Sequence, residues 1–321
     1  MKRKRIILLL LCLILSVTGC SQKKPKTKVD DRIKIGIMLS DVGLGDQSFS
    51  DTAFNGLVKA RDELGILFDY RELNDTGTYE EGLKQLVNEG NDIVIGLGFN
   101  IQQDLEKVAK QFPEQQFVIV DAISELENVT SVTFKEDQGS YLVGIVAALT
   151  TKTNKIGFIG GEDTPLINKF ESGFIEGIRA VNNQITVVSE YANDFGNEQL
   201  GAEIAKKMID NNVDVIYGVA GLTGVGMLKE AQRSKVYGIG VDTDQYFYAE
   251  EAVVTSMLKN IDVAMYQLAE QLVKQGKISK GHIELGLKEN GVDLAPLRVV
   301  NYSKEQIELI ENYKEQLANQ Q

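Results

Sequence analysis

Six apolar segments of the chain end in residues that could hold a small polar ligand. Each segment is a short run rich in apolar and β-branched side chains, and an aspartate or a glycine stands at its end. The six junctions are Ser40-Asp41, Gly98-Phe99, Asp121-Ala122, Gly160-Gly161, Ala220-Gly221 and Asp242-Thr243. Carboxylates accept hydrogen bonds from hydroxyl and amine donors, and glycines let the backbone approach a ligand closely. The pattern predicts a binding site for a molecule that carries such donors.

Histidine and cysteine are too scarce for most catalytic and metal sites. The chain contains one histidine, His282, and two cysteines, Cys12 and Cys20. Structural zinc sites built from Cys and His are therefore excluded, as are triads that use both residue types. His282 lies in a turn before an expected strand, and no G-x-S-x-G nucleophile elbow accompanies it, so we expect it at the surface. These residues favour a binding protein over an enzyme, with no cofactor.

Neither a metal site nor a nucleotide-phosphate site is predicted. The aspartates Asp41, Asp46, Asp242 and Asp244 lack the D-x-D-x-D-G spacing typical of Ca²⁺ loops. The glycine run that begins at Gly221 has the spacing G-x-x-G-x-G, which differs from the dinucleotide fingerprint, and no Lys-Ser/Thr pair follows as in a P-loop. We expect the backbone there to approach a ligand at the start of a helix.

The composition describes a folded, acidic chain. Of its 321 residues 43% are hydrophobic and 25% are charged, and the net charge is −12. This length exceeds the range in which one hydrophobic core is usual, so two domains are expected. Nucleic acid is not an expected partner, because its phosphates require clustered Lys and Arg.

Two sets of alternating strands and helices are predicted. The first set has strands at 33–39, 67–71, 93–97, 117–121 and 129–134, with helices at 50–64, 80–88 and 102–111. After a polar joint at 150–154, strands follow at 156–160, 186–189, 215–219 and 236–241, with helices at 167–181, 198–211 and 224–234. Strands separated by helical crossovers form parallel sheets covered on both faces. The chain is thus predicted to fold into two α/β lobes, with ligands beyond the carboxyl ends of the strands.

Two phenylalanines and one lysine are further candidates for the site. Phe195 lies in a polar loop, which favours stacking on a ligand over packing in the core. Phe49 precedes the first helix, where it is either a ligand contact or a hydrophobic staple. Asp242 ends an apolar strand and needs a partner, and Lys259, at the end of the next strand, is the candidate. Such a pair is either purely structural or also offers its oxygen and ammonium to hydroxyl groups.

Six sequence blocks, in order along roughly residues 33 to 300, carry a family resemblance. Asp41-Val42-Gly43 followed by Asp46-Gln47-Ser48-Phe49-Ser50 resembles the D-x-G…DKSFN opening of the basic membrane protein family. These are substrate-binding lipoproteins of ABC transporters, and several bind purine nucleosides. The other blocks are Phe158–Gly161 with Phe170–Phe174, Ala220–Gly226, Gly240–Gln245, Thr255–Lys259 and Gly286–Val292.

The resemblance implies a type I periplasmic-binding-protein fold: two doubly wound parallel-sheet lobes joined by three crossovers, with a nucleoside in the cleft between them. The ligand-binding residues that it implies are Asp41, Phe49, Ser50, Asp121, Phe195, Gly221, Asp242 and Lys259. The two phenylalanines would sandwich the base, Asp41 and Ser50 would meet its edge, and the others would hold the ribose. The family's usual Asn falls on Ser50 and its usual Lys on Gln47. Ser50 lacks the paired donor and acceptor of an amide, which leaves the base selectivity open.

The first twenty residues are predicted to be a lipoprotein signal. Four cations at 2–5 precede an apolar segment at 6–17, which spans about 18 Å and is too short for a bilayer core of about 30 Å. Val17-Thr18-Gly19-Cys20 resembles the lipobox, where the signal is cut before a cysteine that is then lipidated. We expect residues 1–19 to be the signal peptide and 20–31 to be the lipidated cysteine with a flexible tether.

The leading interpretation is a monomeric, lipid-anchored receptor on the extracytoplasmic face of the cell membrane. It would bind a purine nucleoside, present it to an ABC permease and its ATPase, and close by a hinge motion. Its N-terminal lobe would comprise residues 32–150 with about 259–280, and its C-terminal lobe 151–258 with about 281–321. The alternatives are a regulatory lipoprotein of the same fold that acts through protein contacts, and a sugar receptor. A nucleoside hydrolase is disfavoured because no acid–base or metal constellation is evident.

Overall fold

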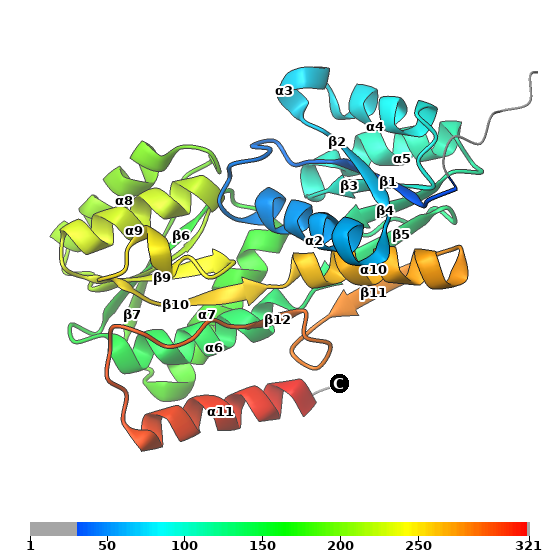
Figure 1. Ribbon diagram of the computed structural model, residues 1–321. Coiled ribbons are helices and arrows are strands. Elements are labelled where there is room, and N and C mark those ends of the chain that lie inside the picture. Colours follow the sequence, from blue (N-terminus) through cyan, green and yellow to red (C-terminus); the bar gives the residue numbers. More distant parts are fainter. Residues whose placement is uncertain (1–30, 320–321) are drawn as a thin grey trace, which may run out of the picture. The chain divides into compact units, whose positions relative to one another are not determined.

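The computed structural model describes residues 31–319. The predicted signal peptide, Cys20 and nearly all of the tether lie outside these described residues. Within the described part of the chain, the residues from 33 onward form one compact unit, which is built from two sheets of six strands each (Figure 1). This agrees with the two lobes predicted from the alternation of strands and helices.

The first sheet is parallel throughout and has helices on both faces. Its strands run in the order β11-β5-β4-β3-β1-β2. They comprise β1 (Lys34–Met38), β2 (Leu67–Arg71), β3 (Ile93–Leu97), β4 (Gln116–Val120), β5 (Val129–Phe134) and β11 (Gly281–Leu285). Helices α2 (Phe49–Leu64) and α10 (Ile261–Gln275) pack together on one face, whereas α4 (Tyr79–Asn88) and α5 (Gln102–Gln111) cover the other (Figure 1). Two short helical turns, α3 (Leu73–Thr76) and η1 (Phe99–Ile101), complete this lobe.

The second sheet repeats this arrangement, except that one edge strand is antiparallel. Its order is β12-β10-β9-β8-β6-β7, and β12 pairs antiparallel with β10. The strands are β6 (Lys155–Gly160), β7 (Thr186–Tyr191), β8 (Val215–Val219), β9 (Tyr237–Asp242), β10 (Val253–Lys259) and β12 (Val292–Leu294). The helices are α6 (Glu136–Thr150), α7 (Pro165–Val181), α8 (Glu198–Asp210), α9 (Gly221–Arg233) and α11 (Lys304–Asn319), with the turn η2 (Tyr246–Tyr248). Helices α6 and α7 cover one face, α8 and α9 the other, and α11 packs on α6 (Figure 1).

Burial explains why the central strands were predictable. All five residues of β3 and of β8 are buried, as expected for strands covered on both faces. The observed bounds of β2, β3, β5, β8 and α5 coincide with the predicted ranges. His282 is exposed on the edge strand β11, as predicted, and its ring nitrogen lies 2.6 Å from the hydroxyl of Thr133.

Two stretches lie in the lobe opposite to the predicted one. Helix α6 was assigned to the N-terminal lobe, but it packs against α7 of the second lobe. Strand β11 was assigned to the C-terminal lobe, but it pairs in parallel with β5 of the first sheet. The chain changes lobes where strands end, directly after β5, after β10 and after β11, rather than at the polar joint at 150–154.

Close helix packing explains part of the glycine content. A Cβ atom built on Gly177 of α7 would lie 1.9 Å from the backbone oxygen of Tyr141 in α6. In α9 a Cβ atom on Gly226 would lie 1.8 Å from the backbone oxygen of Glu198 in α8. The glycine run that begins at Gly221 therefore has a packing role at Gly226, and Gly221 alone of its glycines lines the cavity described below.

Candidate ligand-binding site

A cavity lies where the carboxyl ends of the strands of both sheets meet. The first lobe lines it with the segment between β1 and α2 and with the ends of β3 and β4. The second lobe lines it with the start of α7, the loop before α8, the start of α9 and the ends of β9 and β10. Seven of the eight predicted ligand residues share this cavity: Asp41, Phe49, Asp121, Phe195, Gly221, Asp242 and Lys259.

Ser50 is the predicted residue that does not line the cavity. It is fully buried in the first turn of α2, where its N–H donates to Asp46 Oδ2 at 2.6 Å. Its hydroxyl oxygen lies 2.7 Å from that of Ser40, and Ser40 is the residue that faces the cavity. The structure therefore does not bring Ser50 to the predicted base edge, because its hydroxyl is buried against that of Ser40 and does not reach the cavity.

An aromatic ring from each lobe borders the cavity. Phe49 is the first residue of α2, and its ring centroid lies 5.3 Å from Lys259 Nζ. The ring of Phe195 lies over Gly161 so closely that a Cβ atom there would come within 2.1 Å of it. The carbonyl of Phe195 accepts a hydrogen bond from Thr223 N–H at 3.1 Å, which ties its loop to α9. Both rings are partly buried, and Phe170 of α7 lines the cavity beside them.

A buried ion cluster forms the floor of the site. Lys259 Nζ lies 2.6 Å from Asp121 Oδ2 and 3.1 Å from Glu136 Oε1, and these three side chains are 2%, 3% and 1% exposed. Burial alone would lower the pKa of Lys259, but Asp121, Glu136 and Asp242 outweigh it and raise that pKa above its usual value. Lys259 is therefore charged at neutral pH.

Asp121 of this cluster and Asp242, outside it, occupy equivalent places in the two lobes. Asp121 follows β4 and Asp242 ends β9, each the third strand of its sheet, and both adopt left-handed backbone angles with φ of 66° and 65°. Burial raises the pKa of both carboxyls, and Lys259 opposes this rise. Asp121 Oδ1 is buried without a hydrogen-bond partner, so it is free to accept a ligand hydroxyl.

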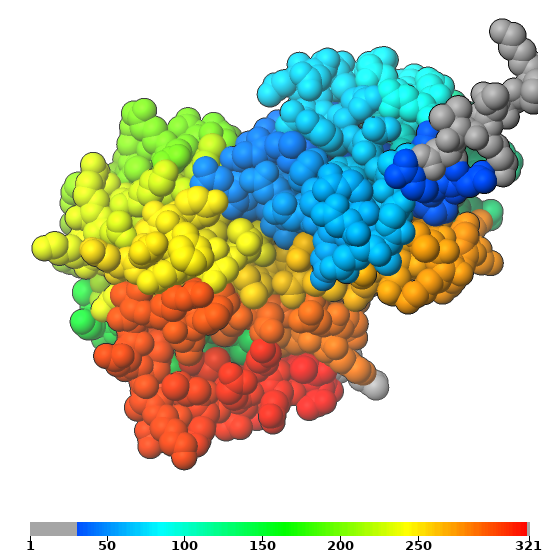
Figure 2. All heavy atoms as spheres, viewed as in Figure 1, coloured from blue at the N-terminus to red at the C-terminus, as the bar shows by residue number. Residues whose placement is uncertain are grey.

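Asp242 contacts the opposite lobe rather than Lys259. The hydroxyl of Ser48 donates to Asp242 Oδ2, and Gln245 Nε2 donates to the backbone oxygen of Gln47 at 3.1 Å. In Figure 2 the blue atoms of the first lobe meet the yellow atoms of the second directly. The predicted Asp242–Lys259 ion pair is thus replaced by Lys259 with Asp121 and Glu136, and Asp242 helps to hold the lobes together.

Asp46 organises the segment that enters the site from the first lobe. Its carboxylate accepts from the N–H groups of Ser48, Ser50 and Asp51 at 3.0, 2.6 and 3.2 Å. Burial raises its pKa to about 6, although these hydrogen bonds oppose the rise. The side chain caps the start of α2 and lines the cavity.

Comparison with known proteins identifies the family. A profile of the Bmp family, described as "ABC transporter substrate-binding protein PnrA-like", matches residues 33–320. The chain belongs to the Bmp family. It is 36% identical to a CD4+ T-cell-stimulating antigen of Listeria innocua, with 95% of this chain and 92% of the relative covered. It is 33% identical to the ABC transporter nucleoside-binding protein BmpA of Lactococcus lactis, with 91% of each covered.

A solved structure supports the same assignment. An ABC transporter solute-binding protein from Aeropyrum pernix matches with a TM-score of 0.82 at 28% identity, covering 89% of this chain and 91% of that one. This Bmp protein is therefore an ABC transporter substrate-binding protein with the type I fold, as the sequence resemblance implied. Of the helices within residues 31–319, none combines the length and apolar character needed to cross a membrane. Those residues also contain no cluster of three His, Cys, Asp or Glu side chains placed to hold a metal ion.

Sequence reasoning missed several residues of the Bmp site. Tyr79 and Phe170 line the cavity, and Glu136 binds Lys259 from behind. Glu136 stands two residues beyond the end of β5, so its place near a strand end is a signal that the sequence does carry. Tyr79 carries no such signal, because it lies at the start of α4, and only the fold brings it to the cavity.

Proposed function

We propose that this Bmp protein binds a purine nucleoside in the cavity between its lobes. The observation that supports this most is the pairing of an aromatic ring from each lobe with a buried carboxylate–ammonium cluster. A base stacked on aromatic side chains gains about 1–3 kcal/mol, which suits Phe49 and Phe195. The ribose hydroxyls would donate to Asp121 and Asp242 and accept from Lys259. Ser40 and Asp41, which follow the carboxyl end of β1, would meet the edge of the base.

The charges at the cavity favour a nucleoside over a nucleotide. Asp41, Asp46, Asp121 and Asp242 line it together with a single cation, Lys259. A phosphate would meet repulsion from the carboxylates and would find no arginine among the lining residues. We therefore expect nucleotides to bind far more weakly than nucleosides.

The proposal extends to the place of the protein in the cell. We propose that Cys20 is lipidated and anchors the chain on the extracytoplasmic face of the membrane, as the lipobox-like Val17–Cys20 suggests. Two acyl chains hold a protein on a membrane stably, whereas one chain binds only marginally. Closure of the lobes around the nucleoside would present the loaded protein to a permease, whose ATPase drives transport.

Native mass spectrometry of freshly purified protein tests the ligand class. The sample is the chain from residue 21 onward, which keeps the whole compact unit that begins at residue 33. A co-purified molecule with the mass of a purine nucleoside is expected. A hexose mass would contradict the proposal in favour of a sugar receptor. Protein that carries no small molecule and binds no added nucleoside would favour a regulator that acts through protein contacts.

A further inference from the structure

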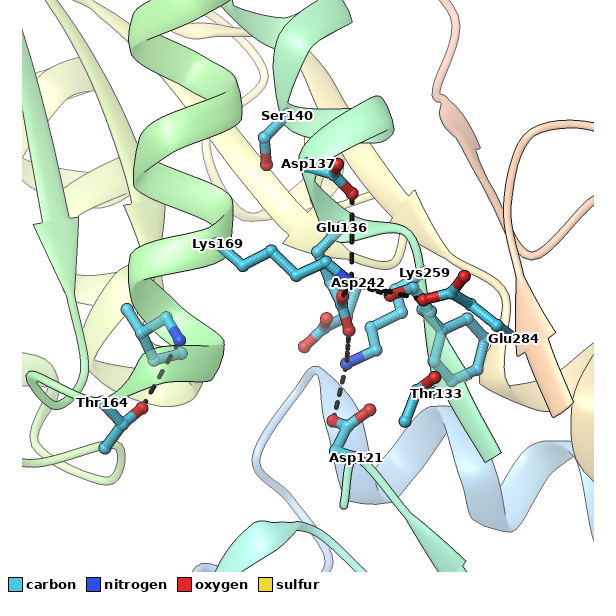
Figure 3. Close-up of polar contacts among 12 residues, drawn as sticks. Asp121, Thr133, Glu136, Asp137, Ser140, Thr164, Lys169, Asp242, Lys259 and Glu284 are labelled. Atoms are coloured by element: carbon cyan, nitrogen blue, oxygen red, sulfur yellow. Dashed lines mark hydrogen bonds and ion pairs between the residues drawn. The ribbon is translucent and has the colours of Figure 1, made fainter. Parts of the chain in front are cut away.

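The ammonium of Lys259 is held from behind by a residue that does not line the cavity. Glu136 is the first residue of α6, and it is 1% exposed. Its Oε1 lies 3.1 Å from Lys259 Nζ, and its Oε2 lies 3.0 Å from Nζ of Lys169 on α7. Figure 3 shows Lys259 between Asp121 and Glu136, with Lys169 reaching Glu136 from the neighbouring helix. Charges therefore alternate along a line from Asp121 through Lys259 and Glu136 to Lys169.

The outer end of this line spans the two lobes. Lys169 Nζ donates to the backbone oxygen of Phe134, at the end of β5, at 2.5 Å. It also faces Glu284 of β11 at 3.9 Å and Asp137 of α6 at 4.0 Å. Phe134 and Glu284 belong to the first sheet, whereas Lys169 belongs to the second lobe. The Lys169 side chain is 34% exposed. The line of charges therefore runs from the buried floor of the cavity to a partly exposed lysine beside the ends of β5 and β11.

Each charge in the line restrains its neighbours. Asp121 uses Oδ2 for Lys259, and its buried Oδ1 has no protein partner. Without Glu136 the ammonium of Lys259 would lose the carboxylate on its far side and would shift toward Asp121 and the cavity. Without Lys169 the buried charge of Glu136 would lack its second cation. The fixed position of Lys259 is what keeps one oxygen of Asp121 available.

We propose that Glu136 and Lys169 are positioning residues that fix the ammonium of Lys259. The Asp121 carboxylate then offers the ligand an acceptor, and Lys259 a donor, in fixed positions. This inference rests on the proposed nucleoside function for its affinity readout. Neither residue touches the ligand itself, and both act through Lys259.

Calorimetric titration with inosine, on the chain from residue 21, measures the effect. Glu136→Gln keeps the side-chain shape and removes the charge. It should weaken inosine binding about ten- to a hundredfold, the range seen when outer partners of metal ligands are removed. Lys169→Met should weaken binding in the same direction, and Lys169→Arg should retain most of the affinity. The double variant should bind no more weakly than Glu136→Gln alone, because Lys169 acts through Glu136.

A matched control and a ligand-free readout complete the test. Lys206→Met alters an exposed lysine that pairs with Asp210 four residues away, and it should leave affinity unchanged. NMR titration of the Lys259 side chain, assigned with a Lys259 variant, should show a lower pKa in Glu136→Gln. Since Lys169 is partly exposed, its variants remain informative if Glu136→Gln does not fold.

Three results would overturn the positioning role. These are wild-type affinity in Glu136→Gln and Lys169→Met, additive losses in the double variant, and a Lys259 titration that Glu136→Gln leaves unchanged. Failure of the wild-type protein to bind any nucleoside would instead refute the proposed function, and the Lys259 titration would still decide the positioning role.

Discussion

Replacing Lys259 by methionine removes the cation that lies between Asp121 and Glu136. All three side chains are at most 3% exposed, and the methionine fills most of the vacated volume, so the change acts mainly through charge. Removing one partner of a buried ion pair costs about 3–5 kcal/mol. Since domains are stable by only about 5–15 kcal/mol, the variant should stay folded at neutral pH with a much smaller free energy of unfolding.

The loss should depend on pH in a direction opposite to ordinary acid denaturation. Burial already raises the pKa of Asp121 and of Asp242, and Lys259 opposes this rise. In the variant both pKa values rise further. A carboxyl whose pKa is higher in the folded than in the unfolded state stabilises the fold at low pH, and this contribution disappears as pH rises through the folded value. The deficit of the variant relative to wild type should therefore be larger at pH 8 than at pH 5.

Urea unfolding followed by circular dichroism at pH 5 and pH 8 measures this deficit. Lys206→Met serves as the control, because that side chain is 50% exposed and its loss should change stability by about 0.5 kcal/mol or less. Equal stability of Lys259→Met and wild type at pH 8 would refute the reasoning, as would a deficit that grows toward pH 5.

Three further predictions concern the aromatic ring of Phe195, the lipid anchor on Cys20 and the packing of α7 on α6 at Gly177. Phe195→Ala should cost about 1–3 kcal/mol of nucleoside binding in calorimetry, whereas Phe247→Ala, at a side chain that is 74% exposed, should cost nothing; equal affinities would remove the stacking role. Cys20→Ser should leave unprocessed, unlipidated precursor on metabolic lipid labelling, and normal maturation would disprove the anchor. Gly177→Ala should lower the free energy of unfolding by about 1–3 kcal/mol, because the added Cβ overpacks against a backbone oxygen of α6. The loss should appear as a lower urea midpoint. Gly224→Ala, whose added Cβ would meet its nearest atom at 3.7 Å, is the matched control, and similar midpoints would contradict the packing argument.

The central strands, such as β3 and β8, were predictable because burial on both faces leaves a continuous apolar run. Helix α6 was not, because 11 of its 15 residues are buried and no polar face gives it a helical period. Without this helix the predicted lobe boundary falls at the polar residues 150–154, whereas the chain enters the second lobe directly after β5. The swap of β11 into the first sheet has no local signal, because pairing with β5 joins residues about 150 positions apart.

Several residues that line the cavity were predictable from strand ends, but their partners were not. Asp121 and Asp242 stand directly at strand ends, and Gly221 lies two residues beyond the end of β8, so topology alone brings all three to the cavity. Lys259 was expected to pair with Asp242, yet it lies 2.6 Å from Asp121, which is 138 residues away in the chain. Such a choice depends on side-chain geometry between two lobes, which the spacing of residues in the sequence does not encode.

Calorimetric titration of ligand-stripped protein shows whether the cavity binds a purine nucleoside. The titrants are adenosine, guanosine and inosine, with ribose and a purine nucleotide as comparisons. At least one purine nucleoside should bind with micromolar or tighter affinity, while ribose and the nucleotide should bind far more weakly. Well-folded protein that binds none of the nucleosides, or that binds ribose as tightly as inosine, would contradict the proposed function.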